Sequence, residues 1–191
     1  MKKILIGTHN KGKFSEISYL LSKKHTRISP ISLKIPSPKE TGKSFSSNSK
    51  IKALFFFRLK KIPVISDDSG LCIKSLNNKP GVHSARFAKK KGGFLKAMNF
   101  ILKKLKKKKD RSATFICSLT FINIKGKLIT VEGRLKGYIS KKILGKNGFG
   151  YDPIFIPNSY KETYGQMKKR EKMKIDHRYL AFKKLRKKIN I

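Results

Sequence analysis

Short apolar runs alternate with helical periodicities along the first third of the chain. Residues 3–8 form an apolar run rich in Ile and Leu that ends in a polar turn, which predicts a buried strand. Apolar side chains then recur at helical spacing between Phe14 and Leu21. A second helix is predicted after Ser46 and Ser47, with these residues at helical spacing: Ile51, Leu54, Phe55 and Arg58. This alternation is typical of an α/β domain.

The middle of the chain predicts strands on either side of an acidic turn. Residues 62–66 form a short strand pattern that is broken by Asp67-Asp68-Ser69-Gly70 and resumes at residues 71–76. Residues 114–122 and 128–135, joined by a Lys-Gly-Lys turn, predict a long β-hairpin. The acidic turn is therefore expected to lie between two strands.

Two later segments have apolar residues at helical spacing. Residues 93–109 have an apolar stripe opposite a lysine-rich face, which predicts an amphipathic helix whose charge run is solvated. The tail, residues 168–191, places Leu180 and Leu185 at helical spacing among basic residues. Together these elements predict one domain, residues 1–191, in which helices flank a mixed β-sheet.

Length and cysteine content agree with a single intracellular domain. A chain of 191 residues, 38% of them hydrophobic, can bury one core. Cys72 and Cys117 stand in apolar stretches without a second Cys or His at metal-ligand spacing, so we interpret them as core thiols in a reducing compartment. The N-terminal apolar run is too short for a signal peptide, and no window reaches the ~18 apolar residues of a membrane span. We expect a soluble, cytoplasmic protein.

The net charge is +38, from 48 Lys and Arg against 10 Asp and Glu. Such a charge favours a nucleic-acid-binding interpretation, but the lysines are spread over almost every surface-type segment. Because Ile, Lys, Asn and Phe are favoured throughout, as under A+T-rich coding, we interpret the charge as compositional drift. Its field would still raise the encounter rate with a triphosphate by roughly ten- to a thousandfold at low salt, and would attract nucleic acid nonspecifically.

Three of the rare carboxylates are candidates for a metal site. Asp67 and Asp68 are adjacent, and their mutual repulsion is costly without a cation. Glu40 stands alone in an acid-poor segment, and hard oxygen ligands from separate loops suit Mg²⁺ bound to phosphates. Each has a structural alternative, because Asp-Ser-Gly is also ordinary turn chemistry and Glu40 could be an exposed loop carboxylate.

The turn after the first strand is a candidate phosphate site. Its sequence is Thr8-His9-Asn10-Lys11-Gly12-Lys13, between a predicted strand and a predicted helix. Backbone N–H groups at a helix start can bind phosphate oxygens while lysines neutralise the charge. The turn lacks the Gly-x-x-x-x-Gly-Lys-Ser/Thr order of a Walker sequence, and polar loops after strands are common.

Two segments near the C-terminus could bind a base and a sugar. Gly148-Phe149-Gly150-Tyr151-Asp152-Pro153 combines flexible backbone, aromatic faces and a carboxylate, although a plain turn before a strand has the same composition. Glu171-Lys172 and Asp176-His177-Arg178 place cations at the start of the predicted last helix.

Taken together, these residues resemble the inosine triphosphatase family, the dITP/XTP pyrophosphatases that clear deaminated purine nucleotides. The resemblance spans residues 3–181. Its ordered motifs are Thr8-His9-Asn10-Lys11-Gly12-Lys13, Glu40-Thr41-Gly42 with Phe45 and Asn48, Ser66-Asp67-Asp68-Ser69-Gly70-Leu71, Pro80-Gly81-Val82-His83-Ser84-Ala85-Arg86-Phe87, residues 148–155, and His177-Arg178.

The resemblance implies roles for the acidic residues and the first turn. Asp68 would be the catalytic carboxylate and would bind Mg²⁺ together with Glu40, with Asp67 as an additional candidate. Cleavage between the α and β phosphates would release the monophosphate and pyrophosphate. The phosphates would lie on Thr8, Asn10, Lys13 and Lys172, beside Ser69, with His9, Lys11 and Gly12 completing the turn.

The resemblance also implies a nucleoside site and an architecture. Phe149, Gly150, Tyr151 and Asp152, with His177 and Arg178, would stack on the base and read its 6-keto oxygen. A 6-amino purine would place a donor against donors, so ATP should be rejected. The fold implied is an ITPase-like α/β fold, an elongated mixed sheet with two lobes and an active-site cleft between them, in a homodimer.

Two positions depart from the family pattern. His9 stands where small residues are usual, and Asp176 stands where Ser is common. Asp176 could pair with Arg178 or Lys172 and weaken their hold on substrate, or it could face solvent harmlessly; we favour solvent. Three other interpretations stay open: an RNA-binding module, an inactive scaffold, and a pyrophosphatase for modified pyrimidine triphosphates. The scattered lysines argue against the first, the survival of rare acids at motif positions argues against the second, and the purine-type motifs argue against the third.

Overall fold

The computed structural model describes residues 2–189 and divides into two compact units. Unit 1 contains the described residues of Met1–Asp68, Cys117–Gly133 and Arg178–Ile191; unit 2 contains Ser69–Ile116 and Arg134–His177. The strand order is β2-β1-β3-β5-β6-β7, with β4 paired to β3. Parallel pairs join β1 to β2 and β3, whereas β3–β4 and β6–β7 are antiparallel, so the sheet is mixed. The predicted class, a mixed sheet flanked by helices, is confirmed.

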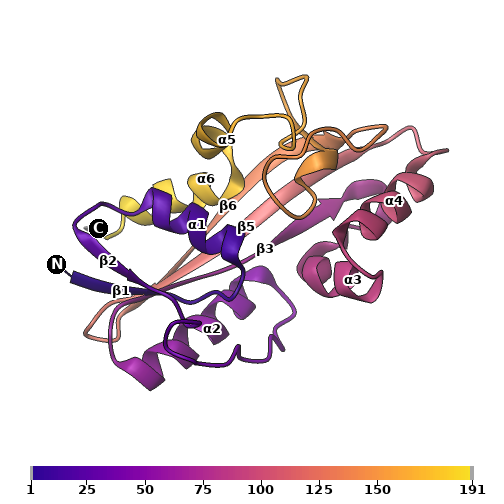
Figure 1. Cartoon of the computed structure of the whole chain (residues 1–191). Helices are drawn as coiled ribbons and strands as arrows, with labels where there is room; N and C mark the ends of the chain where they lie inside the picture. The colour runs from indigo at the N-terminus through magenta and orange to yellow at the C-terminus, as the bar shows by residue number, and fades with distance from the viewer. Residues whose placement is uncertain (1, 190–191) are drawn as a thin grey trace. The chain divides into compact units, whose positions relative to one another are not determined.

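Unit 1 is built on the alternation of side chains along its strands. It contains β1 (Lys2–Ile6), α1 (Lys11–Leu20), β2 (His25–Ile28) and α2 (Phe45–Lys60), most of α6 (His177–Arg186), and parts of β3 (Val64–Ile73), β5 (Ser112–Ile122) and β6 (Leu128–Ile139). Ile4 and Ile6 pack with residues of α1 and α6, whereas Leu5, facing the opposite way, packs with Ala53 and Phe56 of α2. Figure 1 shows α1 and α6 on one side of β1 and α2 on the other.

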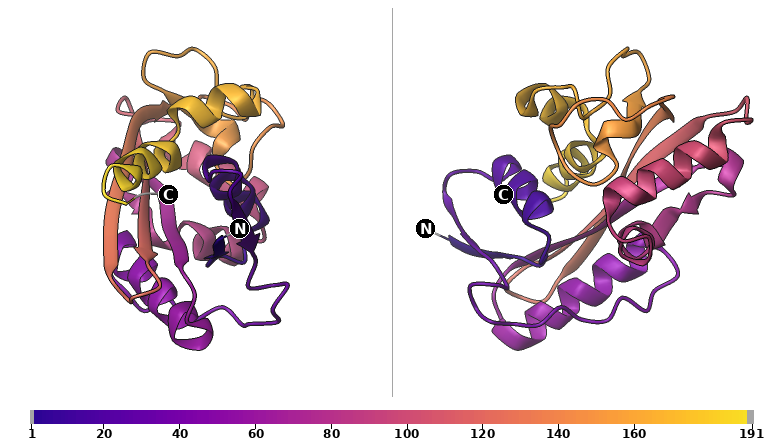
Figure 2. Two further views of the ribbon diagram at one scale, coloured as in Figure 1. Left: turned by 90° about the vertical axis from the view of Figure 1, so that its left-hand side faces the viewer. Right: turned by 45° about the vertical axis from the view of Figure 1, so that its right-hand side comes forward.

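Unit 2 has its own core. Besides the remaining parts of β3, β5 and β6, it contains β4 (Lys79–Pro80), α3 (Ser84–Lys90), α4 (Phe94–Leu105), β7 (Phe155–Pro157), α5 (Lys169–Ile175) and the 3₁₀ turns Lys74–Leu76, Gly81–His83 and Asp152–Ile154. The predicted stripe of α4 is buried through Ala97, Met98 and Ile101, which pack with Leu71 and Phe115. Helices α3 and α4 lie side by side, as the right view of Figure 2 shows.

The predicted break in the acidic segment is wrong. Val64–Ile73 is one continuous strand, β3, so Asp67 and Asp68 belong to a strand and not to a turn. Successive side chains of a strand point to opposite faces. Asp67 therefore meets cations of α1 and α6, while Asp68 meets Asn48 of α2. These contacts compensate two buried carboxylates, which the turn chemistry of Asp-Ser-Gly did not indicate.

The predicted second helix is confirmed as α2. Helix α2 begins at Phe45, where the Ser44 side chain accepts a hydrogen bond from the Ser47 N–H. Its buried residues are Phe45, Asn48, Ser49, Lys52, Ala53 and Phe56. Of the residues that suggested the helix, Leu54 and Arg58 are exposed, whereas Ile51 and Phe55 are half-buried. Half of this buried face is polar, so apolar spacing alone does not define it.

The tail consists of two helices instead of one. Helix α5 ends at Ile175, Asp176 breaks the repeat, and α6 begins at His177. Helix α4 ends at Leu105, four residues before the predicted Lys109. The predicted first strand, first helix and hairpin strands are confirmed, and Cys117 is buried while Cys72 is half-buried. Among the helices of residues 2–189, none is long and apolar enough to cross a membrane.

Candidate active site

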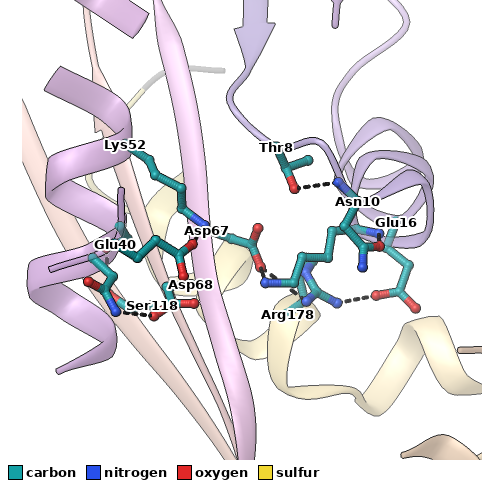
Figure 3. Close-up of polar contacts among 12 residues, drawn as sticks. Thr8, Asn10, Glu16, Glu40, Lys52, Asp67, Asp68, Ser118 and Arg178 are labelled. Carbon is teal, nitrogen blue, oxygen red and sulfur yellow. Dashed lines mark hydrogen bonds and ion pairs between the residues drawn. The ribbon is translucent and has the colours of Figure 1, made fainter. Parts of the chain in front are cut away.

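The turn between β1 and α1 is organised by its own side chains. Asn10 caps α1, and its side-chain oxygen accepts a hydrogen bond from the Lys13 N–H at 3.0 Å. The Thr8 hydroxyl accepts a hydrogen bond from the Asn10 N–H at 3.2 Å. Both residues are labelled in Figure 3. Lys11 is exposed and Gly12 is half-buried, so the turn presents a helix start and positive charge, which suit an anion.

The unusual His9 holds a loop. Its Nε2 lies 2.8 Å from the Ile35 carbonyl oxygen, which can only accept, so His9 donates this hydrogen bond. Its ring also lies 6.1 Å from that of Phe56. The side chain therefore ties the first turn to the segment that leads toward Glu40.

Asp67 joins α1 and α6 through buried ion pairs. Its Oδ2 lies 3.1 Å from Lys13 Nζ and 3.2 Å from Arg178 Nη2, and Arg178 also binds Glu16 (Figure 3). Arg178 is 1% exposed and Asp67 is fully buried. Burial opposes ionisation of Asp67, but Lys13 and Arg178 outweigh it and hold the pKa of that carboxyl well below its usual range. Asp67 is thus a fixed anion.

Asp68 has the opposite character. Its Oδ2 accepts a hydrogen bond from Asn48 Nδ2 at 3.0 Å, and the residue is 4% exposed. Burial, reinforced by the nearby charge of Glu40, raises the pKa of Asp68 against the opposing effect of Lys13, Lys52 and Asn48. A buried carboxylate with a raised pKa can accept a proton from a nucleophile near neutral pH.

Lys52 is the cation beside Asp68. It lies on the buried face of α2, and its Nζ is 2.8 Å from Glu40 Oε1. Burial would lower the pKa of Lys52, but the carboxylates of Asp67, Glu40 and Asp68 together raise it. Lys52 therefore stays charged and partly neutralises the acidic group.

Hydroxyl groups fix α2 against the hairpin strands. The Ser49 hydroxyl lies 3.1 Å from that of Ser118 and 2.8 Å from that of Thr120, and Thr120 lies 2.9 Å from Thr130. Ser49, Ser118 and Thr120 are fully buried. Because Ser49 follows Asn48 in the helix, this network helps to hold the Asn48 amide on Asp68.

Unit 2 brings a second group of the expected residues together. Asp152 Oδ2 lies 2.6 Å from Lys172 Nζ and accepts a hydrogen bond from the Phe149 N–H at 2.9 Å. Lys172 Nζ lies 5.0 Å from the centre of the Phe149 ring and 5.1 Å from that of Tyr164. Lys172 is thus a buried cation between aromatic faces.

The other expected residues of unit 2 have structural contacts. The Tyr151 hydroxyl donates to the Ser84 carbonyl at 2.9 Å inside the core, and burial raises its pKa. The His177 ring stacks on Phe115 at 4.7 Å. Gly150 has φ +68° and lies half-buried, and Ser69 lies half-buried in β3.

The preference for a solvent-facing Asp176 is wrong. The residue is fully buried, at the C-cap of α5. Lys172 and Met173 of α5 precede Asp176 in the chain, and His177 follows it. All three of these residues are buried too. A carboxylate enclosed in this way must be compensated within the protein, because burying an isolated charge is costly.

Comparison with known proteins decides the family. The Ham1 family model matches residues 4–188. The dITP/XTP pyrophosphatases of Borrelia duttonii and Dictyoglomus thermophilum are 39% and 40% identical, covering 98% and 96% of this chain and 96% and 92% of their own lengths. The chain belongs to the Ham1 family. The resemblance inferred from the ordered motifs is thereby confirmed.

Solved Ham1 structures share the architecture. The Staphylococcus aureus Ham1 protein superposes with a TM-score of 0.86 at 31% identity, covering 97% of each chain. The Coxiella burnetii HAM1 protein gives the same TM-score at 34% identity, covering 97% of this chain and 96% of its own. The chain therefore has the Ham1 α/β fold along nearly its whole length.

The acidic group of this Ham1 chain fits a magnesium ion. Glu40 and Asp68 supply hard oxygen donors, and the charge of Glu40 acts on the pKa of Asp68, so the two carboxylates repel each other. Within residues 2–189 no group of three or more His, Cys, Asp or Glu side chains could hold a metal. Mg²⁺ is commonly bound by only one or two carboxylates together with water and substrate phosphates, so two such ligands suffice.

Two buried residues of the site were missed in the sequence. Glu16 binds Arg178, and Lys52 binds Glu40, yet the chain itself suggested neither. Asn48 was found only through the family motif. A signal was present: Phe45, Asn48, Ser49, Lys52 and Phe56 follow helical spacing once polar residues are allowed on the buried side.

Proposed function

We propose that this chain hydrolyses deaminated purine nucleoside triphosphates, namely dITP, ITP and XTP, to the monophosphate and pyrophosphate. This activity would remove them from the nucleotide pool before they enter DNA or RNA. The observation that supports it most is the buried Asp68 carboxylate, whose pKa is raised beside Glu40 and Lys52, in a chain of the Ham1 family. Relatives that bear the name dITP/XTP pyrophosphatase match over nearly the full chain.

In unit 1, Asp68 would orient a water molecule and take its proton as the water oxygen adds to phosphorus and the α–β anhydride bond breaks. Glu40 and Asp68 would hold Mg²⁺, which when bound supplies charge neutralisation at the phosphates. Thr8, Asn10 and Lys13, with His9, Lys11 and Gly12 of the same turn, would bind phosphate oxygens. Arg178 would act chiefly through Asp67, because both of its described ion pairs are to buried carboxylates.

In unit 2, we propose that Phe149, Gly150, Tyr151 and Asp152, together with His177, form the nucleoside-binding residues, and that Lys172 and Ser69 bind phosphate. The Lys172 ammonium beside the Phe149 ring would favour a polar, electron-rich base on that ring. A pocket that donates hydrogen bonds to a 6-keto oxygen leaves its donors unpaired against a 6-amino group. Such mismatches can give discrimination of about 10⁴-fold or more.

The test is pyrophosphate release from dITP, ITP, XTP, GTP and ATP at moderate salt, with Mg²⁺ and with excess chelator. We expect release from dITP, ITP and XTP with Mg²⁺, little release from ATP, and none under chelation. A folded sample that releases no pyrophosphate from any of the three deaminated nucleotides would contradict the proposal.

Lys52 should set the acid limb of the pH profile. Asp68 must be ionised to accept a proton, so activity falls as the pH drops through its raised pKa. Lys52→Met removes a cation that lowers this pKa, and the acid limb of kcat/KM for dITP should move to higher pH. Lys50→Met, at an exposed position of the same helix, is the matched control and should leave the limb in place. An unmoved limb in an active Lys52→Met variant would refute this coupling.

We also propose a location, an assembly state and a domain organisation for this chain. Cys72 and Cys117, which are not joined in a disulfide, support a cytoplasmic location. The family resemblance supports a homodimer. Because β3, β5 and β6 contribute residues to both units, we propose that the two units form one domain. The net charge of +38 supports a nonspecific attraction for nucleic acid.

A further inference from the structure

Aromatic rings and ammonium groups converge on α3 and α4 of unit 2. Lys91 Nζ lies 3.7 Å from the centre of the Phe100 ring and 5.8 Å from that of Phe87. Lys104 Nζ lies 5.7 Å from the Phe100 centre, and the two rings meet edge to face at 5.8 Å. Lysine stems and aromatic rings thus form one mixed surface on these two neighbouring helices.

A surface hollow adjoins this group. It has a volume of about 530 Å³ and is lined by Phe100, Lys103, Lys104, Lys106 and Lys107. Phe100 is half-buried and the four lysines are exposed. We call Phe100 and these four lysines the α4 patch.

The α4 patch is not neutralised by the protein. Residues 69–109 contain no Asp or Glu, and Asp110, the next carboxylate along the chain, lies 3.8 Å from Lys74. In the described part of the chain none of the four lysines forms an ion pair. Four like charges around one hollow repel each other, and a polyanion would relieve that repulsion.

We infer that the α4 patch is a binding site for single-stranded nucleic acid. The four lysines would contact successive backbone phosphates, and Phe100 would offer an apolar surface to a base. This is the combination of positive groove and aromatic platform by which proteins bind single strands without sequence preference. The inference differs from a general attraction by the whole charge, because it assigns the contact to five residues.

A membrane surface fits the patch less well. A helix that lies in a lipid interface must offer its apolar side to the lipid. The apolar side of α4 is instead used in the core of unit 2, where Ala97, Met98, Ile101 and Leu105 are buried. Leu95 is the one exposed large hydrophobic residue of the described α4. Apart from Leu95, the face that remains for a partner is cationic, with one half-buried aromatic ring, Phe100.

The experiment compares two variants of equal charge. The patch variant replaces Lys103, Lys104, Lys106 and Lys107 by Gln; the control variant replaces Lys183, Lys184, Lys187 and Lys188, a similar run in and after α6. Gln keeps helix propensity close to that of Lys. Binding of a labelled oligouridylate about 12 nucleotides long, within the usual size of such sites, is followed by fluorescence anisotropy from low to moderate salt.

We expect the patch variant to bind at least about tenfold more weakly at low salt, with a salt slope smaller by about three, since each lost single-strand phosphate contact removes roughly 0.7. The control variant should stay close to wild type. Equal weakening of both variants would overturn the inference and leave only the general field. The inference would also be overturned if the patch variant lost binding to phosphatidylserine vesicles while its binding to the oligonucleotide stayed unchanged.

Phe100→Leu tests the aromatic part separately. It should weaken oligouridylate binding severalfold without changing the salt slope, because stacking removes no phosphate contact. Circular dichroism and pyrophosphate release from dITP should stay at wild-type values in the patch variant, since none of its residues is among those assigned to the active site. Unchanged binding by a folded Phe100→Leu variant would overturn the role of the ring.

Discussion

Replacing Asp68 with Asn is expected to lower the rate of pyrophosphate release from dITP by about 10³-fold or more. A positioned general base contributes about 10²–10⁴-fold, and the change also removes a proposed charged ligand of Mg²⁺. Asn retains the shape of the side chain and can still accept from Asn48 Nδ2. The loss should therefore appear in kcat more than in KM, and steady-state kinetics at saturating Mg²⁺ measure it.

The same variant should be at least as stable as wild type. Burial raises the pKa of Asp68, so the folded state disfavours the ionised form that exists at neutral pH. Removing that charge therefore relieves the folded protein, and thermal unfolding at pH 7 should show an equal or higher Tm. Asp110→Asn, at a partly exposed position of unit 2, is the control and should keep full activity. Substantial activity in Asp68→Asn, or its failure to fold, would refute this account.

Local patterns predicted the elements whose burial follows hydrophobicity. The strand at residues 3–8, the helix after it and the stripe of α4 were found because their apolar residues are the buried ones. The buried face of α2 could not be predicted from apolar spacing alone, because it includes Asn48, Ser49 and Lys52. Strand β3 was split because Asp67 and Asp68 are unfavourable in a strand unless distant residues compensate them.

The compensation itself could not be predicted from local sequence. Arg178 and Glu16 are 162 residues apart, and Asp67 and Arg178 are 111 apart. No periodicity connects such positions. The family motifs did place Asp67 and Arg178 in the site, but the contact that joins them, and the involvement of Glu16, required the fold.

Replacing Arg178 with Met should destabilise unit 1 strongly. Breaking a buried ion pair by removing one member typically costs about 3–5 kcal/mol, since it leaves buried charge uncompensated. Here Glu16 would lose its described ion pair, and Asp67 would lose one of its two described ion pairs and keep the one with Lys13. Urea unfolding at pH 7 measures the loss. Arg186→Met, at an exposed position of the same helix, is the control and should change the free energy of unfolding little.

The pH dependence of this loss separates charge from packing. In the wild type the pKa of Asp67 is depressed, so its ionised form stabilises the fold above the ordinary carboxyl pKa of 3.8, and this contribution is lost as the pH falls below that value. Without Arg178, ionised Asp67 stabilises the fold less. The difference in stability between wild type and variant should therefore be greatest near neutral pH and narrow as the pH approaches and passes below 3.8. A difference that is constant with pH would indicate lost packing instead.

A double variant tests whether Glu16 is a carboxylate that the loss of Arg178 leaves uncompensated. Glu16→Gln added to Arg178→Met removes the carboxylate that the Arg178→Met change leaves uncompensated. The double variant should therefore be less destabilised than the sum of the two single variants.

The direction in which Arg178→Met changes the free energy of unfolding is informative in this chain. Removing one of 48 Lys and Arg residues should relieve self-repulsion at a net charge of +38. Destabilisation by Arg178→Met would therefore run against the general charge effect and must arise from the buried contacts with Glu16 and Asp67.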